Sequence, residues 1–460
     1  ASAGLGIKID GNSRISLSNN DSGTENTVFG YGAGASLASG GIKNVIIGHN
    51  AGDAINTGDF NTMIGHGVGT DLTTGERNVF LGYGTGANVT QATHNTAVGM
   101  GALGDVTNHV VGTVALGYAS LAASGLTTAA NYTIAIGYLA ANALTTGTNS
   151  IAIGFEAQMS QTTGNRNTVI GHSAMRTADG GEDFNTVIGS EAGYYINNDA
   201  SHDNVIIGKN ALQGGTGTIL GNVAIGSGAM EAVSNNNQTG TIAIGSDALG
   251  ALTSGGENMA IGYEAMKAMT AGAANIAIGY QTMDALNHAD ADANIAIGNN
   301  VLGAVTTQAL HSCVGIGHGA LDAVNNASVA GVIAIGRDAL GQLTNGTGNV
   351  AIGYEAAKTV QGGNQNTIIG YEALEDGDVS NMTMVGYQAG KSINSADAKG
   401  SVGIGDRALT SITSGQGNVA IGSGSLAVED DGDRNTAIGT LALTAQTGTS
   451  GEVHNTAVGW

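Results

Sequence analysis

Apolar and polar residues recur along the chain in a five-residue pattern that ends each time on a glycine, as in N-I-A-I-G at Asn275–Gly279. We count 25 copies between Gly30 and Gly459, and successive motif glycines lie 16 to 20 residues apart. A repeat of this length is typical of a solenoid, in which one structural unit is stacked many times. The pattern therefore predicts an all-β protein, a parallel β-solenoid of about 25 coils of 16–20 residues, over residues 23–460.

Positions in the repeat are numbered from the motif glycine. Position −1 is apolar in every copy, and position −3 is β-branched in every copy except Met259. Because side chains alternate across a strand, −3 and −1 share one face, and we predict that this face fills the coil interior. Position −2, most often Ala, is then expected to point outward. An apolar outer column would be a large exposed stripe, so we expect another copy of the chain to cover it.

Position −4 is Asn in 17 of the 25 copies. Stacked Asn side chains can bond amide to amide along a parallel array, so we predict a structural ladder that joins coil to coil. A row of amides that binds a ligand is the functional alternative. The motif glycine itself predicts a positive φ or a close backbone approach. The ladder residues that we single out are Asn26, Asn44, Asn61, Asn78, Asn95, Asn258, Asn275, Asn294 and Asn435.

The half of each repeat after the glycine is compatible with two local structures. Position +3 is usually Ala, +4 is Leu, Met or Gly, and many copies add an apolar residue at +7, as in Ala248–Leu252. This spacing indicates one helical turn, and a second strand with a bulge fits it equally well. Recurrent T-T-G and T-S-G segments, as at Thr73–Gly75, then turn the chain back.

Residues 1–22 precede the repeats and alternate apolar and polar positions from Ile7 to Leu17, around a D-G-N turn at Asp10–Asn12. This pattern predicts a hairpin that caps the first coil or joins it to a preceding domain. The chain begins at Ala1 without an initiator Met and ends on Trp460, directly after a motif glycine. We therefore expect it to be a portion of a longer protein.

Composition excludes several classes of protein. With 78 Gly, no Pro and no glycine at every third position, the chain is not collagen-like. A net charge of −22, with only 14 Lys and Arg residues, argues against nucleic acid as a partner. The sequence has no run of 18 apolar residues, so we expect no membrane insertion. The single cysteine, Cys313, stands in the Asn column and predicts a buried structural thiol.

Position +1 is the column with a functional appearance, because nine of the twelve Tyr residues lie there. Exposed rings at this position could stack on sugars or contact a partner. In the structural interpretation, which we favour, each ring shields the glycine turn and packs on the ring of the next coil. The candidate surface-binding residues are Tyr263, Tyr280, Tyr354, Tyr371 and Tyr387.

The sequence contains few residue patterns that are typical of enzyme active sites or metal-binding sites. The ten His are scattered, although His49 and His66 occupy neighbouring coils and could stack within metal-bridging reach. D-D-G-D at Asp430–Asp433 suits a cation but lacks a calcium-loop pattern. Because the sequence indicates no nucleophile–base pair, we predict no enzymatic activity, no catalytic or metal-binding residues and no cofactor, and we leave a structural Ca²⁺ open.

The repeat resembles the head of trimeric autotransporter adhesins, the YadA-like heads, whose coils carry a motif of the form N-S-x-A-I-G-x-x-[SA]. Residues Asn149–Ala157 match this motif. The repeat is also similar to N-T-A-I-G-Y-x-A-L arrays of phage tail-fibre proteins, as at Asn435–Gly439 and Tyr371–Leu374. The resemblance spans residues 13–460, and it implies a left-handed parallel β-roll, three chains around one axis and a role in attachment. The coils are longer than those usual in adhesin heads.

These features predict a structural and adhesive fibre protein, a trimeric rod that attaches to a host or surface as a phage tail fibre or a cell-surface adhesin. The expected partners are further copies of the chain, in a homotrimer, and a host surface receptor or glycan. The expected location is extracellular, on a virion or a cell surface.

Two alternative functions remain. An ice- or mineral-surface-binding solenoid would need a flat exposed column of Thr, whereas Thr at −3 is mixed with Val and Ile and is predicted to point inward. A tailspike-like fibre that binds or degrades glycans would keep paired Asp or Glu in a groove, whereas the acids of this chain lie mostly in turns.

Overall fold

The computed structural model describes residues 8–9, 15–16, 25–105, 109–123, 131–304, 309–324, 329–393, 395, 397–428, 431–444 and 451–460. Within these ranges the protein is all-β and has no helix. The chain divides into two compact units, residues 1–222 and 223–460. Each unit is built from stacked coils joined by parallel strand pairs, so the prediction of a parallel β-solenoid is confirmed.

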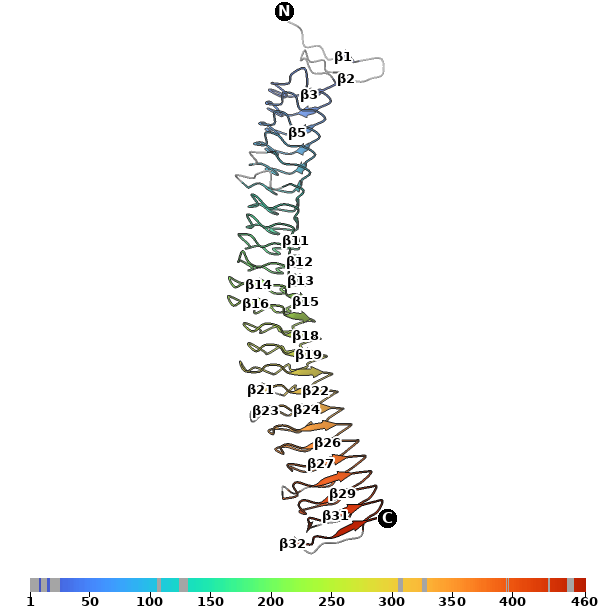
Figure 1. Cartoon of the computed structure of the whole chain (residues 1–460). Helices are drawn as coiled ribbons and strands as arrows, with labels where there is room; N and C mark the ends of the chain where they lie inside the picture. The colour runs from blue at the N-terminus through green and yellow to red at the C-terminus, as the bar shows by residue number, and fades with distance from the viewer. Residues whose placement is uncertain are drawn as a thin grey trace, which may run out of the picture. The chain divides into compact units, whose positions relative to one another are not determined.

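In the first unit, each coil contributes one three-residue strand at positions −3 to −1, and successive strands stack as a parallel ladder (Figure 1). Ile151, for example, pairs with Ile134 on one side and with Thr168 on the other, and all three occupy position −3. Equivalent positions of successive coils therefore lie side by side. The strands are β3 (Thr27–Phe29), β4 (Val45–Ile47), β5 (Thr62–Ile64), β6 (Val79–Leu81), β7 (Thr96–Val98), β8 (Val114–Leu116), β9 (Ile134–Ile136), β10 (Ile151–Ile153), β11 (Thr168–Ile170), β12 (Thr186–Ile188) and β13 (Val205–Ile207).

The second unit repeats this ladder, and Ala277 at position −2 pairs with Ala260 and Ala296 of the adjacent coils. Its strands are β15 (Val223–Ile225), β17 (Ile242–Ile244), β18 (Met259–Ile261), β19 (Ile276–Ile278), β20 (Ile295–Ile297), β22 (Val314–Ile316), β24 (Ile333–Ile335), β25 (Val350–Ile352), β26 (Thr367–Ile369), β27 (Thr383–Val385), β28 (Val402–Ile404), β29 (Val419–Ile421), β31 (Thr436–Ile438) and β33 (Thr456–Val458).

A second, two-residue strand precedes the Asn column in some coils. Within the second unit such strands also pair in parallel, as Leu310 does with Val329. These two-residue strands are β14 (Ile219–Leu220) in the first unit and, in the second unit, β16 (Gln238–Thr239), β21 (Leu310–His311), β23 (Val329–Ala330), β30 (Gly432–Asp433) and β32 (Gly451–Glu452).

The segment before the repeats contains a short antiparallel pair. Strands β1 (Lys8–Ile9) and β2 (Ile15–Ser16) pair with Ile9 opposite Ile15. This is the pairing expected of a hairpin between Ile7 and Leu17. The turn residues Asp10–Asn12 lie outside the described residues.

The orientation of the strands is opposite to the one expected from the sequence. The −2 side chains are fully buried from Ile46 to Ala437, whereas −3 and −1 residues are half-buried or exposed. The prediction that −3 and −1 fill the interior and that −2 faces outward was therefore wrong. The interior is narrow, because side chains at +4 and +7, such as Met283 and Leu286, enter it from the opposite half of the coil. A small Ala at −2 fits opposite them, and branched residues are left on the outside.

The half-coil after the glycine is a series of tight turns. Positions +2 and +4 adopt left-handed conformations, as in Asp247 (φ 56°) and Leu249 (φ 51°). Backbone bonds continue from coil to coil through these turns, since Leu249 N–H donates to the Ala265 carbonyl at 2.9 Å. The suggestion of one-turn helices is therefore wrong for the described coils, and a continuous second strand is not formed there either.

The motif glycine meets both conditions predicted for it. In Gly154, φ is 138°, a conformation that side-chain-bearing residues rarely adopt. A Cβ placed on this glycine would lie 2.3 Å from the carbonyl oxygen of Gly171, the motif glycine of the next coil. Stacked coils thus approach each other too closely at this position for any side chain.

Candidate functional site

The side chains at −3 and −1 form the outer strand face of each unit. At position −1 the exposed fractions are 37% for Ile64, 38% for Val98 and 39% for Ile438, because neighbouring strands cover part of each side chain. Position −3 carries Val, Ile or Thr in every coil except the one with Met259. Each unit therefore presents a row of branched apolar side chains to solvent, and this row takes the place of the small outward column expected from the sequence.

The Asn residues at −4 form hydrogen bonds from coil to coil. The amide oxygen of Asn44 accepts the backbone N–H of Asn61 at 2.9 Å and its Nδ2 at 3.1 Å. The Asn61 amide also donates to the Gly75 carbonyl at 2.8 Å. The same type of coil-to-coil bond involves the other predicted ladder residues, namely Asn26, Asn78, Asn95, Asn258, Asn275, Asn294 and Asn435.

Burial decides between the two interpretations of this column. Asn44, Asn61, Asn275 and Asn294 are each no more than 1% exposed. Amides that are buried and bonded to neighbouring coils have no free surface for a ligand, so the structural interpretation accounts for them.

A second polar column, at position −6, escaped the sequence analysis. In some coils an Asp or Asn side chain at this position accepts the backbone N–H of the preceding coil. The Oδ1 atoms of Asp59, Asp292 and Asp433 each accept such a bond at 2.7 Å, from Ile42, Ala273 and Gln416 respectively. The recurrence of Asp and Asn two residues before the Asn column was the signal that could have revealed it.

The D-D-G-D segment is engaged with its neighbouring coil. Asp431 accepts hydrogen bonds from the hydroxyls of Ser414 at 2.6 Å and Thr413 at 3.0 Å, and these bonds lower the pKa of its carboxyl group. Asp433 belongs to the −6 column, and Asp430 lies outside the described residues. The carboxylates described in this segment therefore act as hydrogen-bond acceptors between coils.

Cys313 replaces an Asn of the ladder and is fully buried. Its backbone N–H still donates to the amide oxygen of Asn294 at 3.0 Å, and burial raises the pKa of its thiol. A neutral, buried thiol is a poor nucleophile.

We therefore expect Cys313 to resist alkylation by iodoacetamide at pH 8 in the folded chain and to react fully in denaturant, because only unfolding exposes and ionises the thiol. Mass spectrometry of the alkylated chain measures both states. Rapid labelling of the folded protein would contradict the burial of this side chain.

The aromatic residues at +1 stack in short runs. In the first unit Tyr31, His49, His66 and Tyr83 form one run, with ring centroids 4.8 to 5.4 Å apart. In the second unit Tyr263 stacks on Tyr280 at 5.4 Å, and Tyr371 stacks on Tyr354 at 4.9 Å and on Tyr387 at 5.5 Å. Ring-on-ring packing is the arrangement of the structural interpretation.

Stacking changes what these rings can bind. Tyr280 and Tyr371 are 48% and 44% exposed, but an interior ring such as Tyr371 has another ring on each face. Sugars bind to the faces of aromatic rings, so the exposed edges of such a stack are poorly suited to them. Acidic residues at +2 border the rows: hydrogen bonding with Glu264 raises the pKa of Tyr263, and Lys391 lowers the pKa of Glu372.

His49 and His66 stack face to face, with an angle of 9° between their planes. Imidazole nitrogens bind metals through lone pairs in the ring plane, so parallel rings direct their lone pairs side by side rather than toward one ion. The two rings continue the aromatic run between Tyr31 and Tyr83.

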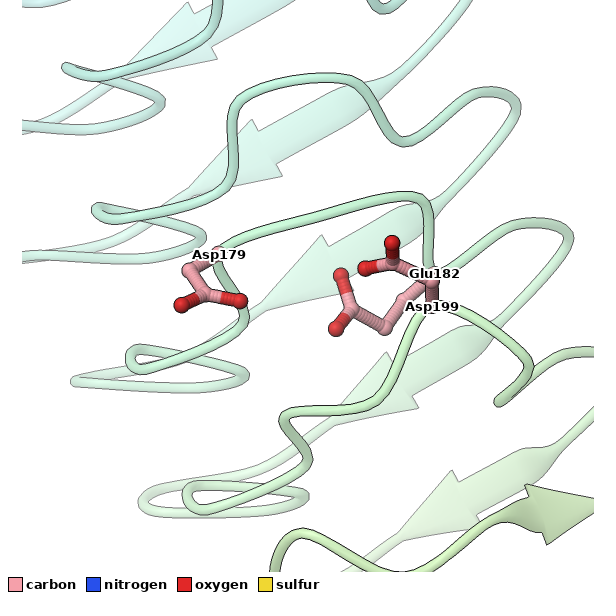
Figure 2. Close-up of side chains that lie close together, drawn as sticks. All are labelled: Asp179, Glu182 and Asp199. Atoms are coloured by element: carbon pink, nitrogen blue, oxygen red, sulfur yellow. The ribbon is translucent and has the colours of Figure 1, made fainter.

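One acidic cluster, in the first unit, was missed by the sequence analysis. Asp179, Glu182 and Asp199 bring one carboxylate oxygen each to within 4.8 Å of one another (Figure 2). Glu182 is fully buried, whereas Asp179 and Asp199 are exposed. Burial raises the pKa of Glu182. The available signal was that Glu182 occupies position −7, which holds Gly or an apolar residue in most coils.

Comparisons with known proteins add no family to these observations. No protein-family model matches the chain, and no curated protein matches it. A search of the described residues found no helix that could span a membrane.

Proposed function

We propose that the chain is a structural and adhesive fibre protein that assembles as a homotrimer and attaches to a host or cell surface. The observation that carries this proposal is the outer strand face, a row of branched apolar side chains in each unit. The resemblance of the repeat to trimeric adhesin heads and tail-fibre arrays supplies the number of chains and the role in attachment.

The composition of each coil supports self-association. One −2 side chain and the side chains at +4 and +7 make a thin interior, so a coil buries little apolar surface by itself. In contrast, half-exposed Ile and Val at −3 and −1 recur in coil after coil. Contiguous apolar patches of this kind mark interaction sites. A second copy of the chain offers the same period and can match the row along its length.

The trimer can be tested by placing charges on the outer strand face. Ile261 and Ile278 pair with each other in adjacent strands and point outward. We expect the unaltered chain to sediment at about 136 kDa, three times 45.3 kDa, and the Ile261→Asp/Ile278→Asp variant to sediment as a monomer. Each carboxylate buried in the interface would cost about 3 kcal/mol or more.

Asn287→Asp/Ala289→Asp is the matched control, because it adds the same two charges at exposed turn positions of the second unit. This variant should remain trimeric. An unaltered chain that sediments as a stable, folded monomer would reject the proposal. A charged pair on the strand face that leaves the trimer intact would reject this face as the interface.

One observation favours the ice- or mineral-binding alternative. Thr at −3 was predicted to point inward, but Thr62, Thr96 and Thr168 lie on the outer strand face and are partly exposed. Val and Ile interrupt this column in most coils, so an unbroken row of Thr is not formed. A thermal-hysteresis assay separates the two functions, since a fibre protein gives no hysteresis and an ice binder does.

A further inference from the structure

The acidic cluster joins two successive coils of the first unit. Asp179 and Glu182 lie between β11 and β12, and Asp199 lies between β12 and β13. Glu182 reaches the cluster from position −7, where its backbone carbonyl accepts a bond from Asn167 at 2.6 Å. Its carboxyl group therefore starts from the coil interior, and the two aspartates approach from the surface.

Glu182 carries a buried oxygen without a partner. Its Oε2 accepts bonds from the Gly180 N–H at 3.2 Å and from Gln161 Nε2 at 3.3 Å, but Oε1 has no hydrogen-bond partner. The side chain as a whole is fully buried. An unsatisfied buried carboxylate oxygen is energetically unfavourable unless a further group binds it.

The coil interior beneath the cluster is polar at positions that are apolar elsewhere. Gln158 and Gln161 occupy +4 and +7, where the next coil has Met175 and Ala178. Gln161 donates to the Glu182 carbonyl at 2.7 Å as well as to its carboxylate. Polar residues in a core are destabilising unless they serve a specific arrangement, and this network holds Glu182 in place.

Gly180 leaves room for the third carboxylate. A Cβ on Gly180 would lie 1.7 Å from Asp199 Oδ1, so the aspartate occupies the space of the missing side chain. The same oxygen accepts the N–H of Gly181 at 3.1 Å. Because φ of Gly180 is not in the left-handed region, close contact with Asp199 is what distinguishes this glycine.

We propose that Asp179, Glu182 and Asp199 bind a divalent cation of the calcium type and thereby join their two coils. The three oxygens are hard ligands within 4.8 Å of one another, and no ion pair of the described residues involves any of the three. Figure 2 shows the carboxyl group of Asp179 across from those of Glu182 and Asp199.

Calcium fits this site better than magnesium. Ca²⁺ accepts six to eight oxygen ligands in flexible geometry, and water can complete the set at exposed positions, whereas Mg²⁺ requires a near-octahedral arrangement. A surface hollow of about 490 Å³ meets the cluster at Asp199; it is lined by Gly181, Asp183, Phe184, Asp199, His202 and Asp203. With two exposed ligands, the expected Kd is about 10⁻⁴ to 10⁻³ M, the range of extracellular calcium modules.

Two other uses of the cluster are less consistent with its geometry. Glu182 could remain a neutral acid, but Oε1, the oxygen that would carry the proton, has no hydrogen-bond partner to accept it. Paired carboxylates also cleave glycosidic bonds, but a fully buried Glu182 cannot reach a sugar in the hollow.

Calorimetric titration of the full chain with CaCl₂ in 0.15 M NaCl tests the proposal. We expect uptake of Ca²⁺ in the stated range and a higher melting temperature in 10 mM Ca²⁺ than in EDTA. Glu182→Gln keeps the shape of the side chain and removes its charge. Gly180→Ala keeps all three carboxylates and displaces Asp199. Both variants should weaken this binding about tenfold or more.

Asp71→Asn is the matched control, because it removes the charge of one exposed carboxylate of the first unit that lies outside the cluster. This variant should bind Ca²⁺ as the unaltered chain does, and circular dichroism establishes that each variant is folded. The proposal is overturned if the unaltered chain takes up no Ca²⁺. It is equally overturned if Glu182→Gln and Gly180→Ala, once folded, bind Ca²⁺ like Asp71→Asn, since uptake would then reflect only the general acidity of the surface.

Discussion

Asn275→Ala is expected to lower the free energy of unfolding by about 3 kcal/mol, because it breaks the ladder in the interior of the second unit. The Asn275 amide donates to the Ala291 carbonyl at 2.7 Å and accepts the Asn294 backbone N–H at 3.1 Å. Both backbone groups would be left buried without these bonds. Urea unfolding of the full chain, followed by circular dichroism, measures the loss.

Asn287→Ala is the control for this substitution. Asn287 is exposed, and its side chain accepts one bond, from the Thr270 hydroxyl at 2.6 Å. Its loss should change stability by less than about 0.5 kcal/mol. If Asn275→Ala were no more damaging than Asn287→Ala, the ladder would not contribute to stability as its hydrogen bonds indicate.

Gly279→Ala is the second substitution with a large expected effect, again about 3 kcal/mol or more. Gly279 has φ at 138°, and a Cβ would lie 1.8 Å from the carbonyl oxygen of Gly298. Relief of this contact requires the adjacent coils to separate, which weakens the pairing between β19 and β20. The urea midpoint of the variant gives the magnitude.

Gly459→Ala isolates the contribution of the contact. Gly459 is the last motif glycine and has a φ of 129°, but a Cβ would meet nothing within 4 Å. The expected loss is only about 1 kcal/mol, the cost of the unfavourable backbone conformation without a contact. Equal losses for the two variants would mean that backbone conformation alone, and not the approach of coils, explains the motif glycine.

The two destabilising substitutions test the stability of a single chain, whereas the charged strand-face pair tests association between chains. Asn275 and Gly279 join coils within one chain, so their loss acts on the free energy of unfolding. Ile261 and Ile278 lie on the outside of the coil, so their replacement acts on association in the proposed trimer. Measurement of both the free energy of unfolding and the sedimentation of every variant separates effects on folding from effects on association.

The candidate sites were predictable from the sequence to different degrees. The aromatic column can be recognised in the sequence, because aromatic residues recur directly after the motif glycine. The stacks follow because equivalent positions of adjacent coils lie side by side. The acidic cluster cannot be recognised in this way, because its residues do not recur at one position of the repeat. Asp179 and Asp199 are 20 residues apart and occupy different positions of two successive coils, so their proximity does not follow from the repeat.

The sequence by itself determined the repeat, the strand position, the polar ladder at −4 and the glycine contact, because each follows from residues that recur at one position in a parallel stack. Only the tertiary structure decided which strand face is interior. Alternation along a strand is the same whichever face points inward. The choice depends on the volume left by side chains from the other half of the coil, such as Met283 and Leu286, and this volume favours a small residue at −2.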